Sequence, residues 1–329
     1  MREKVVRVAV SGSTGQVAYA LLPRIAAGEM FGRDTPIDLR LYDIPPVIEK
    51  AKGTVMELED CAYPLLSRVR ATADRAEAYG DADWVLLVGS KPRGPGMERK
   101  DLIRDNGPIF VDDGKAIAAN ASRDVRVVVV GNPCNTNCLI ALSNAKGVPP
   151  ERFSAMTRLD QNRARGQLAI KAGAAVKDVT RAVVWGNHSS TLFPDFINAR
   201  IAGKKAVDVV DRAWLENEFV PLVQKRGAAV IEARGASSAF SAAQALIDHV
   251  RALVTPTTGD DWFSAAVLSD GKRYGVPAGA VCSFPLRSMG LGEWRIQDGA
   301  VITEYAKKKI EASVQELMQE REIVADLLR

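Results

Sequence analysis

Short apolar runs alternate with helix-like segments through the first half of the chain. Four such runs cover residues 5–10, 38–43, 84–89 and 125–132, and each is rich in β-forming residues such as valine. Runs of this length, separated by helical segments, are typical of parallel strands that helices bury on both faces. The pattern therefore predicts a doubly wound parallel α/β sheet in the first half.

The alternation weakens in the second half. Residues 159–174 and 237–254 have helical periodicity, and a shorter strand-like run covers residues 182–186. This mixture predicts a second domain of mixed α/β structure. We therefore divide the chain into residues 1–155 and residues 156–329.

The composition is that of a folded protein with balanced charge. Of 329 residues, 47% are hydrophobic and 26% are charged, which is not the composition of a disordered chain. The net charge of +4 arises from 44 basic and 40 acidic residues, an excess too small and too scattered for a nucleic-acid surface. The densest basic run, Lys307–Lys309, lies in a predicted helix over residues 304–328. Acids share the polar face of that helix, so we interpret it as a solvated surface and expect no nucleic-acid partner.

The four cysteines predict neither a disulfide framework nor a metal site. Cys134 and Cys138 lack the second ligand pair that a zinc site needs, and four cysteines are few for a chain of this length. We expect free thiols and no bound metal.

No segment has the features of a membrane span or a signal peptide. The N-terminus enters a strand-like run at once, and no run reaches about 18 uncharged apolar residues. We expect a cytoplasmic protein with no membrane partner.

A glycine-containing turn follows the first predicted strand. Residues 12–18 read Gly-Ser-Thr-Gly-Gln-Val-Ala and lead into a helix, so backbone amides can approach a pyrophosphate at the helix N-terminus. The turn departs from the commoner G-x-G-x-x-G pattern and is a weak signal alone. Pro23 falls inside the expected helix, where we expect a kink or a helix end near Leu22.

Asp43 ends the second predicted strand. An acid at this position can bind the ribose hydroxyls of NAD and repel a 2′-phosphate, although it can equally be a cap or a loop acid. The turn, the strand order and Asp43 together favour NAD. The sequence has no G-x-x-x-x-G-K-[ST] motif, which argues against a P-loop nucleotidase.

A loop over residues 89–102 carries Arg93 and Arg99 among glycines and prolines. It follows the third predicted strand, and the carboxyl ends of parallel strands are where such sheets bind ligands. Arginines in a closing loop suit a carboxylate ligand, because the planar guanidinium binds carboxylates in a bidentate way. The alternative is an ordinary polar surface loop.

Asn132 comes at the end of the fourth predicted strand, in Gly131-Asn132-Pro133. Its amide can hold a substrate oxygen or a cofactor at the same sheet edge, although asparagine is also a common turn former.

Asp160 and Arg163 lie three residues apart, which places them on one face of a helix. They can form a surface ion pair of little consequence, or they can orient a histidine and clamp a carboxylate. Oxidation of an alcohol needs a group near neutral pKa to take the hydroxyl proton. His188 and His249 are the only two histidines. His249 lies in an amphipathic helix, whereas His188 follows a strand-like run, as a strand-end catalytic residue does.

These segments together resemble the NAD-dependent malate dehydrogenases, specifically the cytosolic-type group of the lactate and malate dehydrogenase superfamily. The resemblance covers nearly the whole chain. It is carried by residues 131–137, 157–164, 183–190, 226–243 and 269–277.

The resemblance implies a role for each candidate residue. His188 would accept the proton of the malate C2 hydroxyl, and Asp160 would orient the imidazole and stabilise its charged form. Arg163 would bind the C1 carboxylate, Arg93 the distal carboxylate and Arg99 the C2 oxygen.

The resemblance also implies a Rossmann domain followed by an α/β substrate domain, a homodimer and NAD as cofactor. Asn132 would orient the substrate, and Ser241 is a further candidate substrate contact. The implied NAD contacts are Gly12, Ser13, Thr14, Gly15, Gln16, Val17, Ala18, Asp43, Asn106, Val130, Gly131 and Asn132.

The chain departs from this family at several positions. Gln161 replaces a usual histidine and Cys134 a common alanine, without removal of a charged catalytic group. Asp113 stands where relatives often carry glutamine, and its negative charge is unfavourable near NAD. Two alternatives stay open: a dehydrogenase of another 2-hydroxy acid, and a non-catalytic NAD-binding protein.

Overall fold

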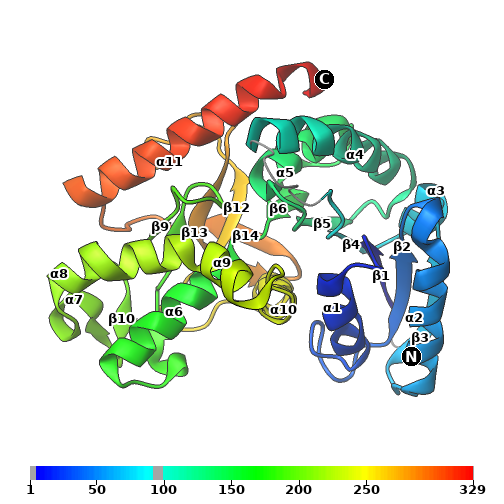
Figure 1. Cartoon of the computed structure of the whole chain (residues 1–329), viewed down its shortest axis with the longest axis horizontal. Helices are drawn as coiled ribbons and strands as arrows, with labels where there is room; N and C mark the ends of the chain where they lie inside the picture. The colour runs from blue at the N-terminus through cyan, green and yellow to red at the C-terminus, as the bar shows by residue number, and fades with distance from the viewer. Residues whose placement is uncertain (1–4, 92–98, 329) are drawn as a thin grey trace.

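A computed structural model describes residues 5–91 and 99–328 of the chain (Figure 1). Its central element is a sheet of nine strands in the order β14-β13-β12-β6-β5-β4-β1-β2-β3. Strands β1 to β6 are all parallel to their neighbours within this group. They are β1 (Val6–Ser11), β2 (Ile37–Tyr42), β3 (Leu66–Thr72), β4 (Trp84–Leu87), β5 (Arg126–Val129) and β6 (Phe153–Ala155).

Helices cover both faces of this parallel sheet, which confirms the predicted doubly wound fold. Alternate side chains of β1 enter different cores: Val8 and Val10 pack in one, and Ala9 packs in the other. A strand buried in this way needs apolar residues at every position, which explains the continuous runs in the sequence. The helices of this half are α1 (Gln16–Ala26), α2 (Ile48–Asp60), α3 (Arg75–Tyr79), α4 (Arg99–Asn120) and α5 (Cys134–Asn144).

Three antiparallel strands from the second half extend the same sheet beyond β6. Ala266 of β12 pairs with Ala155 of β6, and β13 and β14 follow. These strands are β12 (Phe263–Leu268), β13 (Val281–Gly290) and β14 (Glu293–Ile296). The sheet thus continues across the predicted boundary at residue 155, and the division into two domains stays a prediction.

The rest of the second half is helical with short strands, and the predicted mixed α/β character is confirmed. Its main helices are α6 (Arg158–Ala172), α9 (Val220–Arg234), α10 (Phe240–Val254) and α11 (Glu304–Ile323). The short elements are β7 (Val179–Thr180), β8 (Val184–Trp185), β9 (Phe193–Pro194), β10 (Arg200–Ile201), β11 (Lys204–Lys205), α7 (Ala206–Val209) and α8 (Arg212–Trp214).

Of the two alternatives expected at Pro23, a kink or a helix end near Leu22, the helix end is excluded, because α1 continues through Pro23 to Ala26. Leu21, Leu22 and Ile25 on this helix are fully buried, and their packing offsets the hydrogen bond that proline cannot donate.

The predicted helix over 304–328 is present as α11 (Glu304–Ile323), which ends before a short 3₁₀ helix over Ala325–Leu327, and its polar face is not wholly solvated. Lys307 and Lys308 are exposed as expected, whereas Glu320 is only 3% exposed. Figure 1 shows α11 running across the second half of the molecule toward α4 and α5. Helix periodicity alone does not reveal that this end of the helix is covered.

All four cysteines are free thiols, as expected; Cys61 is exposed and the other three are buried. Within the described residues, no helix has the length and apolar character that a membrane crossing requires.

His249 is a fully buried residue of α10. Its Nε2 lies 2.9 Å from Oγ of Ser154. Burial, with a smaller contribution from the charge of Arg158, lowers the pKa of the ring to about 3. The ring is therefore neutral and structural.

This burial predicts a specific loss of stability in acid. Unfolded histidine has a pKa of about 6.5. Between this value and the folded pKa of about 3, the unfolded chain binds a proton that the folded ring does not. The free energy of unfolding therefore falls as the pH falls through this window, by up to ~1.4 kcal/mol per pH unit from this group. We expect His249→Gln to flatten that slope in urea unfolding between about pH 6 and 4. An equal slope in both proteins would contradict the prediction.

Candidate active site

His188 and Asp160 form a direct pair. His188 follows β8, and its Nδ1 lies 2.5 Å from Oδ2 of Asp160 in the first turn of α6. The Asp160 side chain is 1% exposed and that of His188 is 16% exposed. A carboxylate at Nδ1 holds the proton of the neutral ring there, so Nε2 is left as the acceptor.

Arg163 completes this cluster as predicted from the three-residue spacing. Its Nη1 lies 3.1 Å from Oδ1 of Asp160, and its Nη2 donates to Oγ of Ser238 at 3.4 Å. Burial alone would raise the pKa of Asp160, but its interaction and hydrogen bond with His188 and the charge and hydrogen bond of Arg163 outweigh burial and lower the pKa. Asp160 is therefore ionised at neutral pH beside the imidazole.

Asn135 holds the backbone of the histidine loop. Its Oδ1 accepts from the His188 amide at 3.1 Å, and its Nδ2 donates to the carbonyls of Gly186 at 3.2 Å and Val281 at 2.9 Å. Sequence reasoning chose Asn132 in this segment and missed Asn135. The available signal was a run of polar residues at the start of α5, all of which prove to be buried.

Asn132 lies where β5 leads into α5, at the carboxyl end of a parallel strand, and its side chain is exposed. Beside it, Gly131 permits a close approach of two loops, because a Cβ there would lie 2.7 Å from the Gly89 carbonyl oxygen. Val130 and Gly131 both donate to the Leu87 carbonyl, at 2.9 and 3.1 Å. Ser241 is exposed in the first turn of α10.

The two predicted loop arginines have different outcomes. Arg93 lies outside the described residues. Arg99 is the first residue of α4, and its Nε donates to Oε1 of Glu320 at 2.6 Å. The side chain of Arg99 is 34% exposed, whereas that of Glu320 is 4% exposed.

The turn after β1 fits a dinucleotide pyrophosphate. Gly12 has φ +63°, and a Cβ on it would lie 2.3 Å from Cα of Gly89. Gly15 is the N-cap of α1 and provides no side-chain cap, so the first amides of the helix are available to an anion. The fully buried Ser13 Oγ has no hydrogen-bond partner among the described residues, as expected of a group that a ligand completes. Gln16, Val17 and Ala18 form the first turn of α1.

Asp43 closes this turn from the neighbouring strand. Its Oδ2 accepts from the amide and hydroxyl of Thr14, at 2.9 and 2.8 Å, and its Oδ1 accepts from the Ile44 amide at 2.9 Å. The acid is thus held at the end of β2, beside the glycine turn, where a ribose binds in folds of this kind.

Asn106 is fully buried, and its amide binds protein groups. Its Oδ1 accepts from the Lys91 amide at 2.7 Å, and its Nδ2 donates to the Leu102 carbonyl at 3.0 Å. It fixes the backbone of Lys91, near the start of the loop predicted over residues 89–102.

The unusual Asp113 is compensated within the protein. Its carboxylate pairs with Nε of Arg75 at 2.8 Å and accepts from the Tyr79 hydroxyl at 2.9 Å. Burial raises the pKa of Asp113, and the pairing with Arg75 opposes that shift. The guanidinium of Arg75 thus offsets the negative charge that stands where relatives often carry glutamine.

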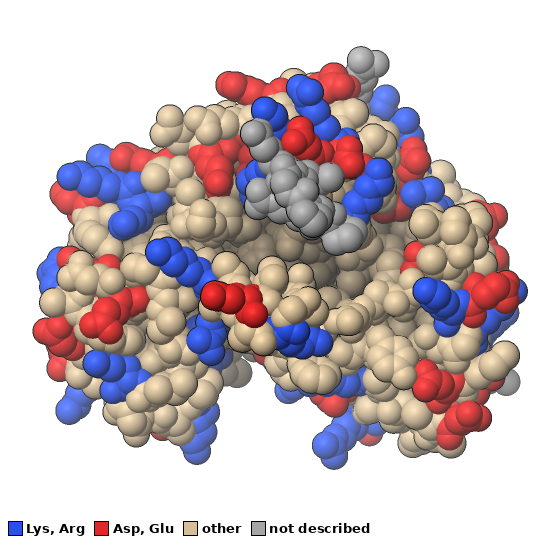
Figure 2. Space-filling model, in the orientation of Figure 1, with Lys and Arg blue, Asp and Glu red and all other residues tan. Residues whose placement is uncertain are grey.

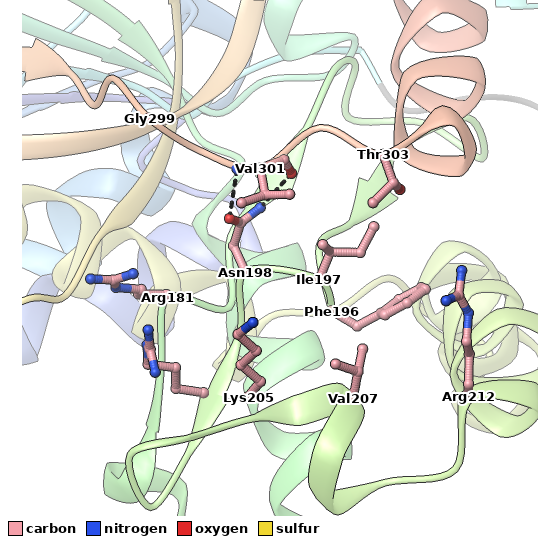
Figure 3. A pocket seen from close by; sticks show the side chains of 11 residues that line it. Arg181, Phe196, Ile197, Asn198, Lys205, Val207, Arg212, Gly299, Val301 and Thr303 are labelled. Atoms are coloured by element: carbon pink, nitrogen blue, oxygen red, sulfur yellow. Dashed lines mark hydrogen bonds between the residues drawn. The ribbon is translucent and has the colours of Figure 1, made fainter.

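In the orientation of Figure 1, the surface of the molecule is hollowed near its centre (Figure 2). A separate cavity of about 270 Å³ lies within the second half, where Asn198 is hydrogen-bonded to the backbone of Val301 (Figure 3). Its lining includes Arg181 and Lys205 and none of the predicted site residues that the structure describes. No group of three or more potential metal ligands occurs among the described residues.

Comparison with known proteins shows two family profiles that together match nearly the whole chain. The profile of the lactate/malate dehydrogenase NAD binding domain matches residues 6–154, and that of the lactate/malate dehydrogenase alpha/beta C-terminal domain matches residues 157–327. The chain belongs to the lactate/malate dehydrogenase family. The resemblance recognised in the sequence is thereby confirmed at the level of the family, and the NAD-binding domain confirms the predicted cofactor class.

Members of this family resemble the chain along its full length. A protein named malate dehydrogenase from Magnetococcus marinus is 56% identical over 324 residues, which is 98% of each chain. The crystal structure of malate dehydrogenase from Naegleria fowleri has a TM-score of 0.95 at 43% identity and covers 99% of this chain and all of that one. The lactate dehydrogenase of Trichomonas vaginalis, in complex with NADH and oxamate, has a TM-score of 0.94 at 37% identity, with 98% and 99% of the two chains covered.

The pairing of His188 with Asp160 predicts a large catalytic effect of a small change. Asp160→Asn removes the anion that fixes the ring and stabilises its charged form. We expect kcat/KM for NADH oxidation with a 2-oxo acid to fall by roughly 10³ to 10⁴-fold.

The matched control for Asp160→Asn is Asp248→Asn. The Asp248 carboxylate of α10 accepts from Asn162 of α6 at 2.8 Å and from Gln244 at 2.9 Å, and His188 is not among its hydrogen-bond partners in the described structure. We expect this variant to stay within about 3-fold of the parent. An Asp160→Asn protein with native circular dichroism and more than about a tenth of the parental activity would refute the assigned role.

Proposed function

We propose that the chain is an NAD-dependent malate dehydrogenase that interconverts (S)-malate and oxaloacetate. The observation that carries the proposal is the His188–Asp160 pair, with Arg163 on the same buried carboxylate. The 56% identity to a protein named malate dehydrogenase supports the choice of substrate. The relative solved with NADH and oxamate supports NAD as the cofactor.

The proposed proton path uses Nε2 of His188. The C2 hydroxyl of malate gives its proton to Nε2, and the ring becomes an imidazolium whose charge Asp160 stabilises at Nδ1. In the reverse direction the imidazolium returns that proton to the C2 oxygen. NAD⁺, when bound, accepts the hydride from C2. The buried anion therefore contributes most when the ring is charged, which is when the alcohol is being oxidised.

The proposed carboxylate contacts position C2 beside the histidine. Arg163 would bind the C1 carboxylate, and Arg99 would donate to the C2 oxygen. Arg93, through its place in the family pattern, would bind the distal carboxylate that distinguishes malate from lactate. Asn132 and Ser241 are the further proposed substrate contacts.

A dehydrogenase of another 2-hydroxy acid is the second candidate. The lactate dehydrogenase of Trichomonas vaginalis shares the fold at a TM-score of 0.94, so the fold by itself does not select the acid. The higher identity to the malate dehydrogenase of Magnetococcus marinus favours malate. The intact histidine–aspartate pair argues against a non-catalytic NAD-binding protein.

Substrate preference tests the proposed function. We expect fast NADH oxidation with oxaloacetate and slow oxidation with pyruvate or a branched 2-oxo acid. Arg93→Gln should lower the oxaloacetate rate by roughly 100-fold or more, because the distal carboxylate loses its ion-pair partner, with some gain on pyruvate. An unchanged oxaloacetate rate would remove Arg93 from the assignment. Absence of turnover with every 2-oxo acid would favour the non-catalytic protein.

We also propose a cytoplasmic homodimer of the cytosolic-type group. Large apolar side chains are exposed on several neighbouring helices: Tyr19 on α1 (55%), Met56 on α2 (63%) and Ile170 on α6 (74%). Helices α1 and α6 both pack against α10. Burial of such side chains by a second copy would stabilise a dimer.

Sedimentation measures the proposed assembly. We expect a mass of twice the chain mass at micromolar concentration, and a shift toward monomer in Ile170→Glu. The control is Leu291→Glu, at a residue that is 88% exposed in the β13–β14 turn. A monomeric parent protein would exclude the dimer.

A further inference from the structure

Glu320 of α11 is a buried carboxylate with partners from three distant segments. Its Oε1 accepts from Nε of Arg99 at 2.6 Å and from Nδ2 of Asn187 at 2.9 Å. Its Oε2 accepts from the hydroxyl of Thr136. These partners belong to the start of α4, the loop of His188 and the first turn of α5. One carboxylate thus joins the three parts of the chain that supply the site.

Because the Glu320 carboxylate is buried, its charge must be compensated by these contacts. A carboxylate that is only 3% exposed is costly unless charge and hydrogen bonds compensate it, and Arg99 is the cation that does so. The position of the Arg99 guanidinium is therefore tied to that of Asn187, which directly precedes His188 in the chain.

The contact with Glu320 also determines which nitrogens of the Arg99 guanidinium remain available to another acceptor. Glu320 occupies Nε, so Nη1 and Nη2 are left for other acceptors. Nη2 is buried and has no hydrogen-bond partner among the described residues. A buried donor without a partner is rare in folded proteins and indicates a group that a ligand completes.

The start of α5 contacts both parts of this cluster. Thr136 donates its hydroxyl to Glu320, and Asn135 accepts from the His188 amide at 3.1 Å. Cys134 beside them is buried. Burial raises the pKa of its thiol to about 12, with the charges of Asp160 and Glu320 acting in the same direction and that of Arg99 against them.

We propose that Glu320 is a positioning residue of the dehydrogenase site: it holds Arg99 against the His188 loop with its Nη donors directed toward the C2 oxygen. This inference rests on the proposed function. Loss of the Glu320 charge lets the guanidinium turn, and the donor to the C2 oxygen is no longer in place when negative charge develops there.

Glu316, one turn earlier on α11, provides the matched comparison. Its Oε2 accepts from Asn187 at 2.8 Å, from Thr191 at 2.7 Å and from the hydroxyl of Ser189. It holds the same loop as Glu320, and Arg99 is not among its hydrogen-bond partners in the described structure. If the α11 carboxylates only stabilised this loop, substitution of Glu316 and substitution of Glu320 would have the same effect on kcat and the same coupling to Arg99.

A double-mutant cycle separates these roles. We expect Glu320→Gln to lower kcat for 2-oxo acid reduction by roughly 10 to 100-fold while the Kd of NADH, from fluorescence titration, stays unchanged. In an Arg99→Ala background, Glu320→Gln should cause little further loss, because the group it positions is absent. Glu316→Gln should lower kcat by the same factor in the parent protein and in the Arg99→Ala background, whatever the size of that factor. Equal coupling of both glutamates to Arg99, or no loss in Glu320→Gln, would overturn the proposal.

Two further measurements keep the test decisive. Glu320→Asp retains the negative charge on a shorter side chain, so this variant should fold even if Glu320→Gln does not. Its kcat should lie between that of the parent and that of Glu320→Gln. A native-like kcat in Glu320→Asp, with Glu320→Gln unable to fold, would assign Glu320 to stability alone. The ratio of variant to parent is measured on whichever 2-oxo acid the parent reduces. Failure of the malate assignment is then visible in the parent protein and is separate from failure at Glu320.

Discussion

A buried carboxylate must be compensated, and Asp160 is the carboxylate on which the site depends. It is 1% exposed, and both of its oxygens are used, one by His188 and one by Arg163. The same anion therefore orients the proton acceptor and the guanidinium proposed to hold the substrate. Because its interactions with these partners keep the pKa of Asp160 below its usual value in spite of burial, the carboxylate is ionised at neutral pH.

The sheet brings the two halves of this site together. The glycine turn, Asp43 and the segment of Asn132 all lie at the carboxyl ends of parallel strands, whereas His188 and Asp160 come from the second half. Asn135 ties the two groups through the backbone of the histidine loop, and Glu320 ties them through Arg99. The C-terminal helix is thus part of the support of the site, although it is remote from it in sequence.

Local patterns in the sequence predicted the parallel strands, the glycine turn and the shared helix face of Asp160 and Arg163. Each of these features depends on residues that are close together along the chain. Contacts between distant segments could not be predicted in this way. Glu320 has the periodicity of a solvated face and is buried only because α4 and α5 cover that end of α11. Nothing local showed that the charge of Asp113 would be offset by Arg75, or that β12 would extend the sheet from β6.

The central claim is that Asp160 holds the neutral ring of His188 with its proton on Nδ1. The chain has two histidines, so nitrogen-15 NMR of selectively labelled protein resolves both rings, and His188→Gln assigns them. The account predicts a protonated Nδ1 and an unprotonated Nε2 in the neutral ring of His188, and loss of that preference in Asp160→Asn. A neutral ring protonated on Nε2 in the parent protein would contradict it, because that ring could not accept the substrate proton.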